Sequence, residues 1–102
     1  MSSLGLNQHE RDLLTGVFRR HPEIDEVRIF GSRAKGNHKN NSDIDLALWG
    51  KLNWQLLGRV AGELDELPLP YIFDLTIYDS IQNPQLKEHI ERVGSTIYSR
   101  EG

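Results

Sequence analysis

The chain contains no cysteine among its 102 residues. A disulfide framework, a thiolate zinc or iron–sulfur site and a thiol nucleophile are therefore all excluded. Aromatic residues are few, at 8% of the chain, but the hydrophobic fraction of 37% and the charged fraction of 26% are those of an ordinary globular protein. The length fits one domain, so we expect residues 1–102 to form a single domain with one core.

Long hydrophobic runs are missing as well, since a bilayer-spanning helix needs about 20 apolar residues and the apolar stretches here are far shorter. The first ten residues, MSSLGLNQHE, have neither the basic start nor the apolar centre of a signal peptide. We therefore expect a cytoplasmic protein with no membrane partner. The formal charge of −3 argues against a surface that coats nucleic acid.

Three helices are predicted from their capping residues. Asn7 caps the first, with Glu10 as its reciprocal partner, and this helix is expected to end near residue 20. Asn53 caps the second, which ends before Pro68, and Asn83 caps the last, with a proline at its first position and Gly94 after its end.

Strands are predicted at 26–30, 43–49 and 71–78, where apolar residues alternate with polar ones or form a short β-branched run. A short extended segment is expected at 96–98. The polar segment 31–42 reads as a loop in which residues 32–35 form one helical turn. The fold class is thus α+β: a small mixed sheet with helices packed on one face, in the order α-β-(short α)-β-α-β-α.

Acidic residues lie on two of the predicted strands. Asp43 and Asp45 are two residues apart, so their side chains point to the same face, and Asp74 occupies the corresponding place on a later strand. If the two strands are neighbours, three carboxylates meet on one face. Hard oxygen donors of this kind suit Mg²⁺ or Mn²⁺, although solvated acids on an exposed face are the alternative.

A Gly-Ser pair, Gly31 and Ser32, ends the first predicted strand ten residues before Asp43. A turn there exposes backbone N–H groups and a hydroxyl to an anion. The glycine spacing is also that of a P-loop, but Asn37 and His38 stand where that motif requires Lys and Ser or Thr, which argues against a Walker-type ATPase.

The Gly-Ser pair, the Asp-Ile-Asp motif at 43–45 and the later Asp74 together resemble the signature of the DNA polymerase β-like nucleotidyltransferase superfamily. The segment Gly-Ser-Arg-Ala-Lys-Gly and the short chain are similar to those of the minimal, MNT-type members of this superfamily. The resemblance implies the minimal nucleotidyltransferase fold and a metal-dependent transfer of a nucleoside monophosphate, AMP from ATP in the first instance, to an acceptor hydroxyl.

The resemblance also implies a role for each motif residue. Two divalent ions, Mg²⁺ or Mn²⁺, would be held by the catalytic acids, which are Asp43, Asp45 and Asp74. The nucleoside triphosphate would be gripped by the loop residues, which are Gly31, Ser32, Arg33 and Lys35. One ion would lower the pKa of the acceptor hydroxyl and the other would neutralise charge on the leaving pyrophosphate.

Larger members of the superfamily cover the site with a second domain, and this chain has no residues to supply one. Minimal members occur with a helical HEPN-type protein encoded nearby, in toxin–antitoxin pairs, so the resemblance implies such a partner as acceptor. Two alternatives stay open: a non-catalytic protein that neutralises a helical partner by surface contact, and an antibiotic-type transferase acting on a small molecule. Association into homo-oligomers is also open.

Two further pairs of residues carry structural predictions. Trp49 and Trp54 bracket a turn, and we expect both to pack rather than to stack on a base. Gly58 and Gly62 lie within the second helix and are expected to let another element approach it closely.

Overall fold

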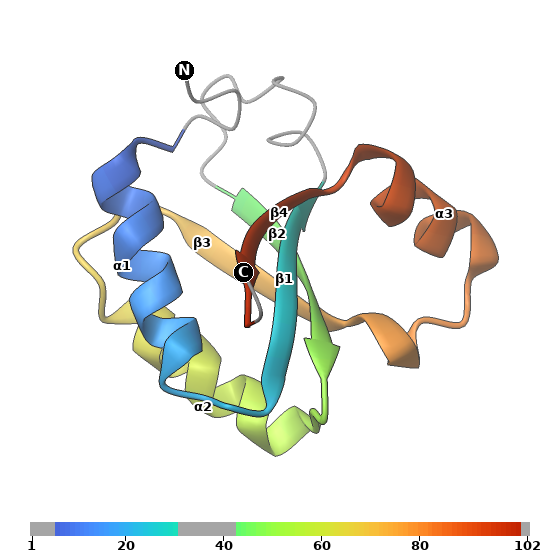
Figure 1. The fold of residues 1–102 in the computed structure, drawn as a ribbon, viewed down its shortest axis with the longest axis horizontal. Helices are drawn as coiled ribbons and strands as arrows, with labels where there is room; N and C mark the ends of the chain where they lie inside the picture. The colour runs from blue at the N-terminus through green and yellow to red at the C-terminus, as the bar shows by residue number, and fades with distance from the viewer. Residues whose placement is uncertain (1–5, 31–42, 101–102) are drawn as a thin grey trace.

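A computed structural model describes residues 6–30 and 43–100. The elements follow one another along the chain as α1 (Gln8–Arg19), β1 (Ile24–Phe30), β2 (Asp43–Gly50), α2 (Trp54–Asp65), β3 (Ile72–Ile77), the 3₁₀ turn η1 (Tyr78–Ser80), α3 (Pro84–Val93) and β4 (Ser95–Ser99) (Figure 1). The predicted α+β class is confirmed. The helical turn expected at 32–35 lies outside the described residues.

The three predicted helix starts are confirmed by their caps. At α1, the Asn7 side chain accepts a hydrogen bond from the Glu10 backbone N–H at 2.8 Å, and the Glu10 carboxylate accepts one from the Asn7 N–H at 3.1 Å. Asn53 accepts from a backbone N–H of α2, and Asn83 does the same for α3, which has proline at its first position. These local hydrogen bonds satisfy N–H groups that the helix itself leaves unpaired.

One mixed sheet joins the strands in the order β3-β2-β1-β4. The β2 and β3 strands are parallel, with α2 as the crossover between them, and the other two pairs are antiparallel. The extended segment expected at 96–98 is the edge strand β4. At the end of the β1–β2 hairpin Gly50 adopts a φ of +140°, and a Cβ there would lie 2.0 Å from the Glu23 carbonyl oxygen, so this position requires glycine.

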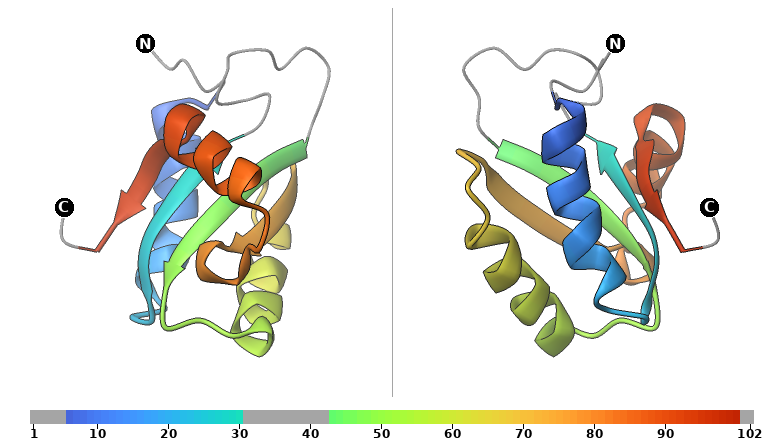
Figure 2. Two further views of the ribbon diagram at one scale, coloured as in Figure 1. Left: turned by 90° about the vertical axis from the view of Figure 1, so that its right-hand side faces the viewer. Right: turned by 60° about the vertical axis from the view of Figure 1, so that its left-hand side comes forward.

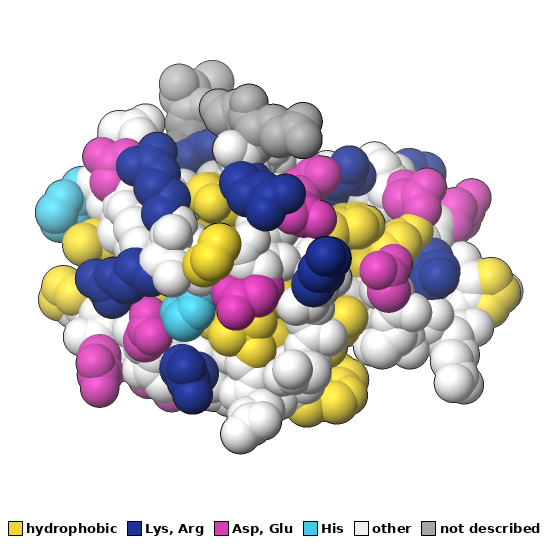
Figure 3. All heavy atoms as spheres, turned by 60° about the horizontal axis from the view of Figure 1, so that its bottom comes forward, with side chains coloured by type: hydrophobic (Ala, Val, Ile, Leu, Met, Phe, Trp, Pro, Cys, Tyr) yellow, Lys and Arg dark blue, Asp and Glu magenta, His cyan; other side chains and the backbone are white. Residues whose placement is uncertain are grey.

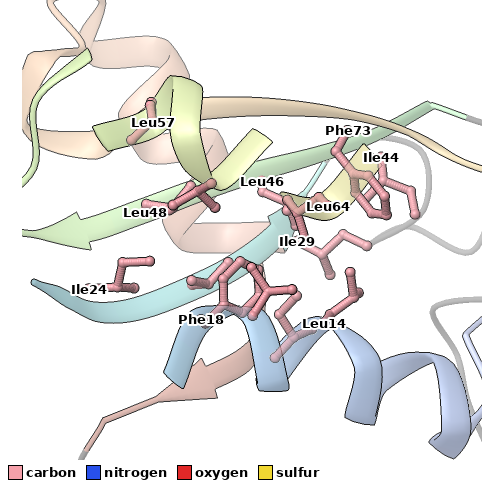
Figure 4. Packing of buried hydrophobic residues seen from close by; sticks show 14 of the residues in the cluster. Leu14, Phe18, Ile24, Ile29, Ile44, Leu46, Leu48, Leu57, Leu64 and Phe73 are labelled. Carbon is pink, nitrogen blue, oxygen red and sulfur yellow. The ribbon is translucent and has the colours of Figure 1, made fainter. Parts of the chain in front are cut away.

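The main core lies between one face of the sheet and helices α1 and α2. Leu14 and Phe18 of α1 point toward the buried side chains of β1 and β2, among them Ile29 and Leu46 (Figure 4). Leu64 of α2 completes this layer over the β2–β3 side. Each of these side chains is at most 1% exposed, so the alternating apolar positions of the strands all face the two helices.

Helix α3 lies on the opposite face of the sheet, whereas the sequence predicted all helices on one face (Figure 2). Its Ile90 is fully buried with Ala47 and Tyr78 in a second, smaller apolar cluster. Phe30 and Trp49 pack against the edge of this cluster. The apolar side chains on this second face of β1 and β2 therefore bury one helix. The amphipathic pattern of α3 alone does not indicate which face of the sheet the helix covers.

Candidate active site

The strand register brings two of the predicted acids together. In the parallel β2–β3 pair, the Cα of Asp45 is the direct partner of the Cα of Asp74. Ile44 and Leu46 flank Asp45 and are fully buried on the helix-covered face, so Asp45 lies on the other face, and the buried Phe73 orients Asp74 in the same way. The two carboxylates thus lie side by side on the face of the sheet that α1 and α2 leave open.

Asp43 is the first residue of β2, and its Cα is paired with that of Ile72. It precedes Asp45 by two residues, which is the separation of positions on one side of a strand. Its side chain lies outside the part of the structure that is described. The third acid of the predicted set is therefore located by its backbone register.

The predicted phosphate-binding residues Gly31, Ser32, Arg33 and Lys35 lie outside the described residues. The structure does show where the chain enters that segment. Phe30 is the last residue of β1, and its Cα is the direct antiparallel partner of the Cα of Asp45. The Gly-Ser pair therefore follows a residue that is level with Asp45, one strand away from it.

No group of three His, Asp or Glu side chains that could hold a metal ion is found among the described residues, a set that leaves out the side chain of Asp43. The two described acids nevertheless have the chemistry that Mg²⁺ prefers, because carboxylate oxygens are hard donors and one cation can bridge two of them. Asp74 is exposed, and Asp45 is partly exposed. A divalent ion can therefore reach both, so this pair fits a metal site to which a third ligand is added.

Aromatic and charged side chains form a second cluster under α3, which the sequence did not reveal. The Trp49 ring stacks on the Tyr78 ring at a centroid distance of 4.5 Å, and the Arg28 guanidinium lies 4.9 Å from the centroid of Trp49. The Lys87 ammonium lies 5.2 Å from the centroid of Tyr78. The Tyr78 hydroxyl donates a hydrogen bond to Glu91, and this hydrogen bond, with burial and the negative charge of Glu91, raises the pKa of Tyr78.

A cavity of about 330 Å³ lies at the other end of the sheet and is lined by Asp25, Glu26, Trp49, Ser99 and Arg100. Trp49 follows Asp45 by four residues of β2, or about 13 Å along a strand. The cavity is therefore separate from the acidic pair.

Trp49 packs as the sequence predicted, whereas Trp54 is 63% exposed, so the prediction that it packs is wrong.

The expected close approach at Gly58 and Gly62 is also not observed. A Cβ built at either position meets no atom within 4 Å, because both lie on the outer face of α2.

No helix of the described residues has the length and hydropathy that a membrane crossing requires.

The fold is similar to that of solved toxin–antitoxin structures. A toxin–antitoxin complex with AMP-PNP has a chain that is 23% identical, with a TM-score of 0.66, over 89% of this chain and 74% of that one. The MntA–HepT toxin–antitoxin gives 22% identity and a TM-score of 0.62, over 93% and 74% of the two chains. The complex of a tri-AMPylated HEPN toxin with the MNT antitoxin from Shewanella oneidensis gives 20% identity and a TM-score of 0.63, over 94% and 75%.

A search of curated proteins gives no match to this chain. The family model described as "Polymerase beta, Nucleotidyltransferase" matches residues 13–102, which include β1, β2 and β3 with their acidic positions. Since this match extends over far more than half of the sequence, the chain belongs to the polymerase beta nucleotidyltransferase family.

Proposed function

We propose that this nucleotidyltransferase moves AMP from ATP to a hydroxyl group of a helical, HEPN-type partner protein. The observation that carries the proposal is the direct pairing of Asp45 with Asp74 across parallel strands, on the face left open by α1 and α2. Asp43 precedes Asp45 by two residues, the separation of positions that share one side of a strand, and we assign it as the third acid.

The chain's own residues divide the work of the reaction. The three acids would hold Mg²⁺ or Mn²⁺, and the bound ions would supply Lewis-acid polarisation and charge neutralisation at the phosphates. Gly31 and Ser32 would bind the triphosphate through a backbone N–H and a hydroxyl, with Arg33 and Lys35 adding positive charge. The pairing of Phe30 with Asp45 supports this role, because Phe30 directly precedes Gly31 in the sequence and is level with Asp45 on the neighbouring strand.

The transfer is an in-line displacement at the α-phosphorus. The acceptor oxygen forms a bond to this phosphorus while the bond to the β-phosphate oxygen breaks, so that AMP becomes esterified and pyrophosphate leaves. The acceptor hydroxyl loses its proton in this step. Asp74 is the exposed carboxylate at the outer side of the pair, and we assign it the role of orienting that hydroxyl and receiving the proton.

The descriptions of the similar solved structures support the proposed nucleotide and acceptor. One of the similar structures is described as a toxin–antitoxin with AMP-PNP, and another contains a tri-AMPylated HEPN toxin bound to an MNT antitoxin. The chain spans about three quarters of the length of these relatives. The net charge of −3 argues against nucleic acid as the acceptor, and on the face shown in Figure 3 positive and negative side chains are interspersed.

The test is incubation of this protein with ATP labelled at the α-phosphate, Mg²⁺ and the helical protein encoded next to its gene. We expect label on the neighbouring protein, a loss of at least a hundredfold with Asp74→Asn, and no loss with Asp79→Asn, since Asp79 is an exposed acid on η1 outside the paired strands. Binding of the neighbour without label would support a non-catalytic interaction protein instead. Label on a small hydroxyl compound alone would support a small-molecule transferase.

A further inference from the structure

The strand that carries Asp74 has one unpaired edge in the described structure. β2 pairs with one side of β3, and no described strand lies along the other side. An edge strand presents a row of backbone N–H and C=O groups that can pair with an added strand. No Lys, Arg or Pro, the residues that commonly block such an edge, occurs in β3.

An exposed apolar side chain lies on this strand beside the acidic pair. Of the described residues, two large hydrophobic side chains are strongly exposed, Trp54 at 63% and Ile72 at 59%. Trp54 begins α2, whereas Ile72 lies two residues before Asp74 and is paired with Asp43. Positions two apart on a strand share a face and are separated by about 7 Å. Ile72 is therefore an apolar contact point within reach of a group held at Asp74.

The strand order also fixes the direction from which an acceptor reaches the site. Phe30, Asp45 and Asp74 form one row across β1, β2 and β3, which spans about 10 Å because adjacent strands are about 4.8 Å apart. On the proposed function, the leaving pyrophosphate lies toward the Gly-Ser pair that follows Phe30. In-line attack places the acceptor oxygen opposite the leaving group, which is the β3 end of the row.

The charge of this part of the chain indicates the chemistry of the partner. Between Arg59 and Lys87 there is no basic residue. Glu63 in this interval pairs with Arg20 and His21, and the other acids are Asp65, Glu66, Asp74 and Asp79. An approaching segment that carries Lys or Arg is attracted to this stretch, whereas an acidic one is repelled.

We infer that the acceptor protein docks through a basic, extended segment that pairs with the outer edge of β3, sets an apolar side chain against Ile72 and brings its hydroxyl beside Asp74. This inference rests on the proposed function for the direction of attack, and it adds the docking surface and the type of segment. Backbone pairing provides affinity and the row of side chains provides the register.

The first test compares Ile72→Ser with Trp54→Ser, which removes an equally exposed apolar side chain from α2. With the helical neighbour as acceptor, Ile72→Ser is expected to raise the KM for that protein about tenfold and to leave the KM for ATP within twofold. Trp54→Ser is expected to leave both unchanged, and Ile72→Val to restore the KM for the acceptor. Equal effects of the two serine variants would overturn the inference.

The second test follows amide hydrogen exchange of residues 72–77 when the neighbouring protein is added. Amides that point away from β2 exchange rapidly in the free protein and are expected to slow at least tenfold on binding, in an alternating pattern. Labelling of the neighbour without this protection overturns the docking surface and leaves the transferase intact. Protection without labelling supports the docking surface and overturns the transferase. Neither protection nor labelling overturns both.

Discussion

Replacing Asp74 by asparagine should stabilise the metal-free protein. Asp45 and Asp74 are direct partners across parallel strands, which places their carboxylates about 5 Å apart. Two unit charges at this distance repel by about 3 kcal/mol at an effective dielectric of 20 and by about 0.8 kcal/mol in bulk water. Because Asp74 is exposed, the lower part of this range applies, and we expect Asp74→Asn to raise the free energy of unfolding by about 1 kcal/mol.

The assay is urea unfolding at low and high salt. The gain should shrink in 1 M NaCl, where the Debye length falls to about 3 Å, which is shorter than the separation of the carboxylates. Asp79→Asn is the matched control, because Asp79 is also exposed but lies on η1 and is not in register with another acid. We expect no comparable salt-dependent gain from this control.

In the presence of Mg²⁺, Asp74→Asn is expected to be less stable than the unsubstituted protein, whereas it is expected to be more stable without the metal. On the proposed function, Mg²⁺ held at the paired acids would stabilise the native state by about 2.7 kcal/mol at a concentration of 100 times its dissociation constant. Asp74→Asn should lose most of this response in a thermal unfolding experiment, and Asp79→Asn should keep it. If Asp74→Asn instead destabilises the metal-free protein and retains the full Mg²⁺ response, the two acids do not share a cation.

Three further predictions concern stability. The raised pKa of Tyr78 means that this side chain ionises first in the unfolded chain, so its contribution to the free energy of unfolding is constant below about pH 10 and falls above it. Tyr78→Phe should lower the free energy of unfolding at pH 7 through the lost hydrogen bond to Glu91 and should reduce the alkaline decline measured by urea unfolding from pH 8 to 11. Gly50→Ala should lower the melting temperature severely or prevent folding, whereas Gly58→Ala, in open space on α2, should raise stability by about 0.5–1 kcal/mol. Asn53→Ala should cost about 1 kcal/mol, measured by urea unfolding, since it removes the cap of α2.

The helices and the faces of the strands could be predicted because the interactions that define them are local. An asparagine cap acts within three residues, and alternation along a strand assigns Ile44 and Asp45 to opposite faces without any knowledge of the neighbours. The choice of face for α3 could not be predicted in this way. Its apolar stripe fits either face, and the deciding contact, Ile90 with Ala47, joins residues 43 positions apart.

The sequence predicted which residues form the candidate site, but it left their arrangement conditional on the strand order. That β2 and β3 are adjacent and parallel, with Asp45 opposite Asp74, depends on strand order, which no single segment encodes. The stacking of Trp49 on Tyr78 depends on the same long-range arrangement. Trp54 was expected to pack because tryptophan is usually buried, but it begins α2 on an outward-facing position that no other element covers in the described structure.

The packing of the core keeps Asp45 and Asp74 in register although their carboxylates repel each other. Ile44, Leu46 and Leu48 alternate with Asp43, Asp45 and Ala47 along β2 and are fully buried. A slip of β2 by one residue would move these side chains away from α1 and α2 to the opposite face, at a cost of about 1.5–3 kcal/mol for each. The total of at least about 4.5 kcal/mol exceeds the upper estimate of about 3 kcal/mol for the repulsion of the two acids. The pair therefore persists without a cation, and on the proposed function a metal ion would meet carboxylates that are already side by side.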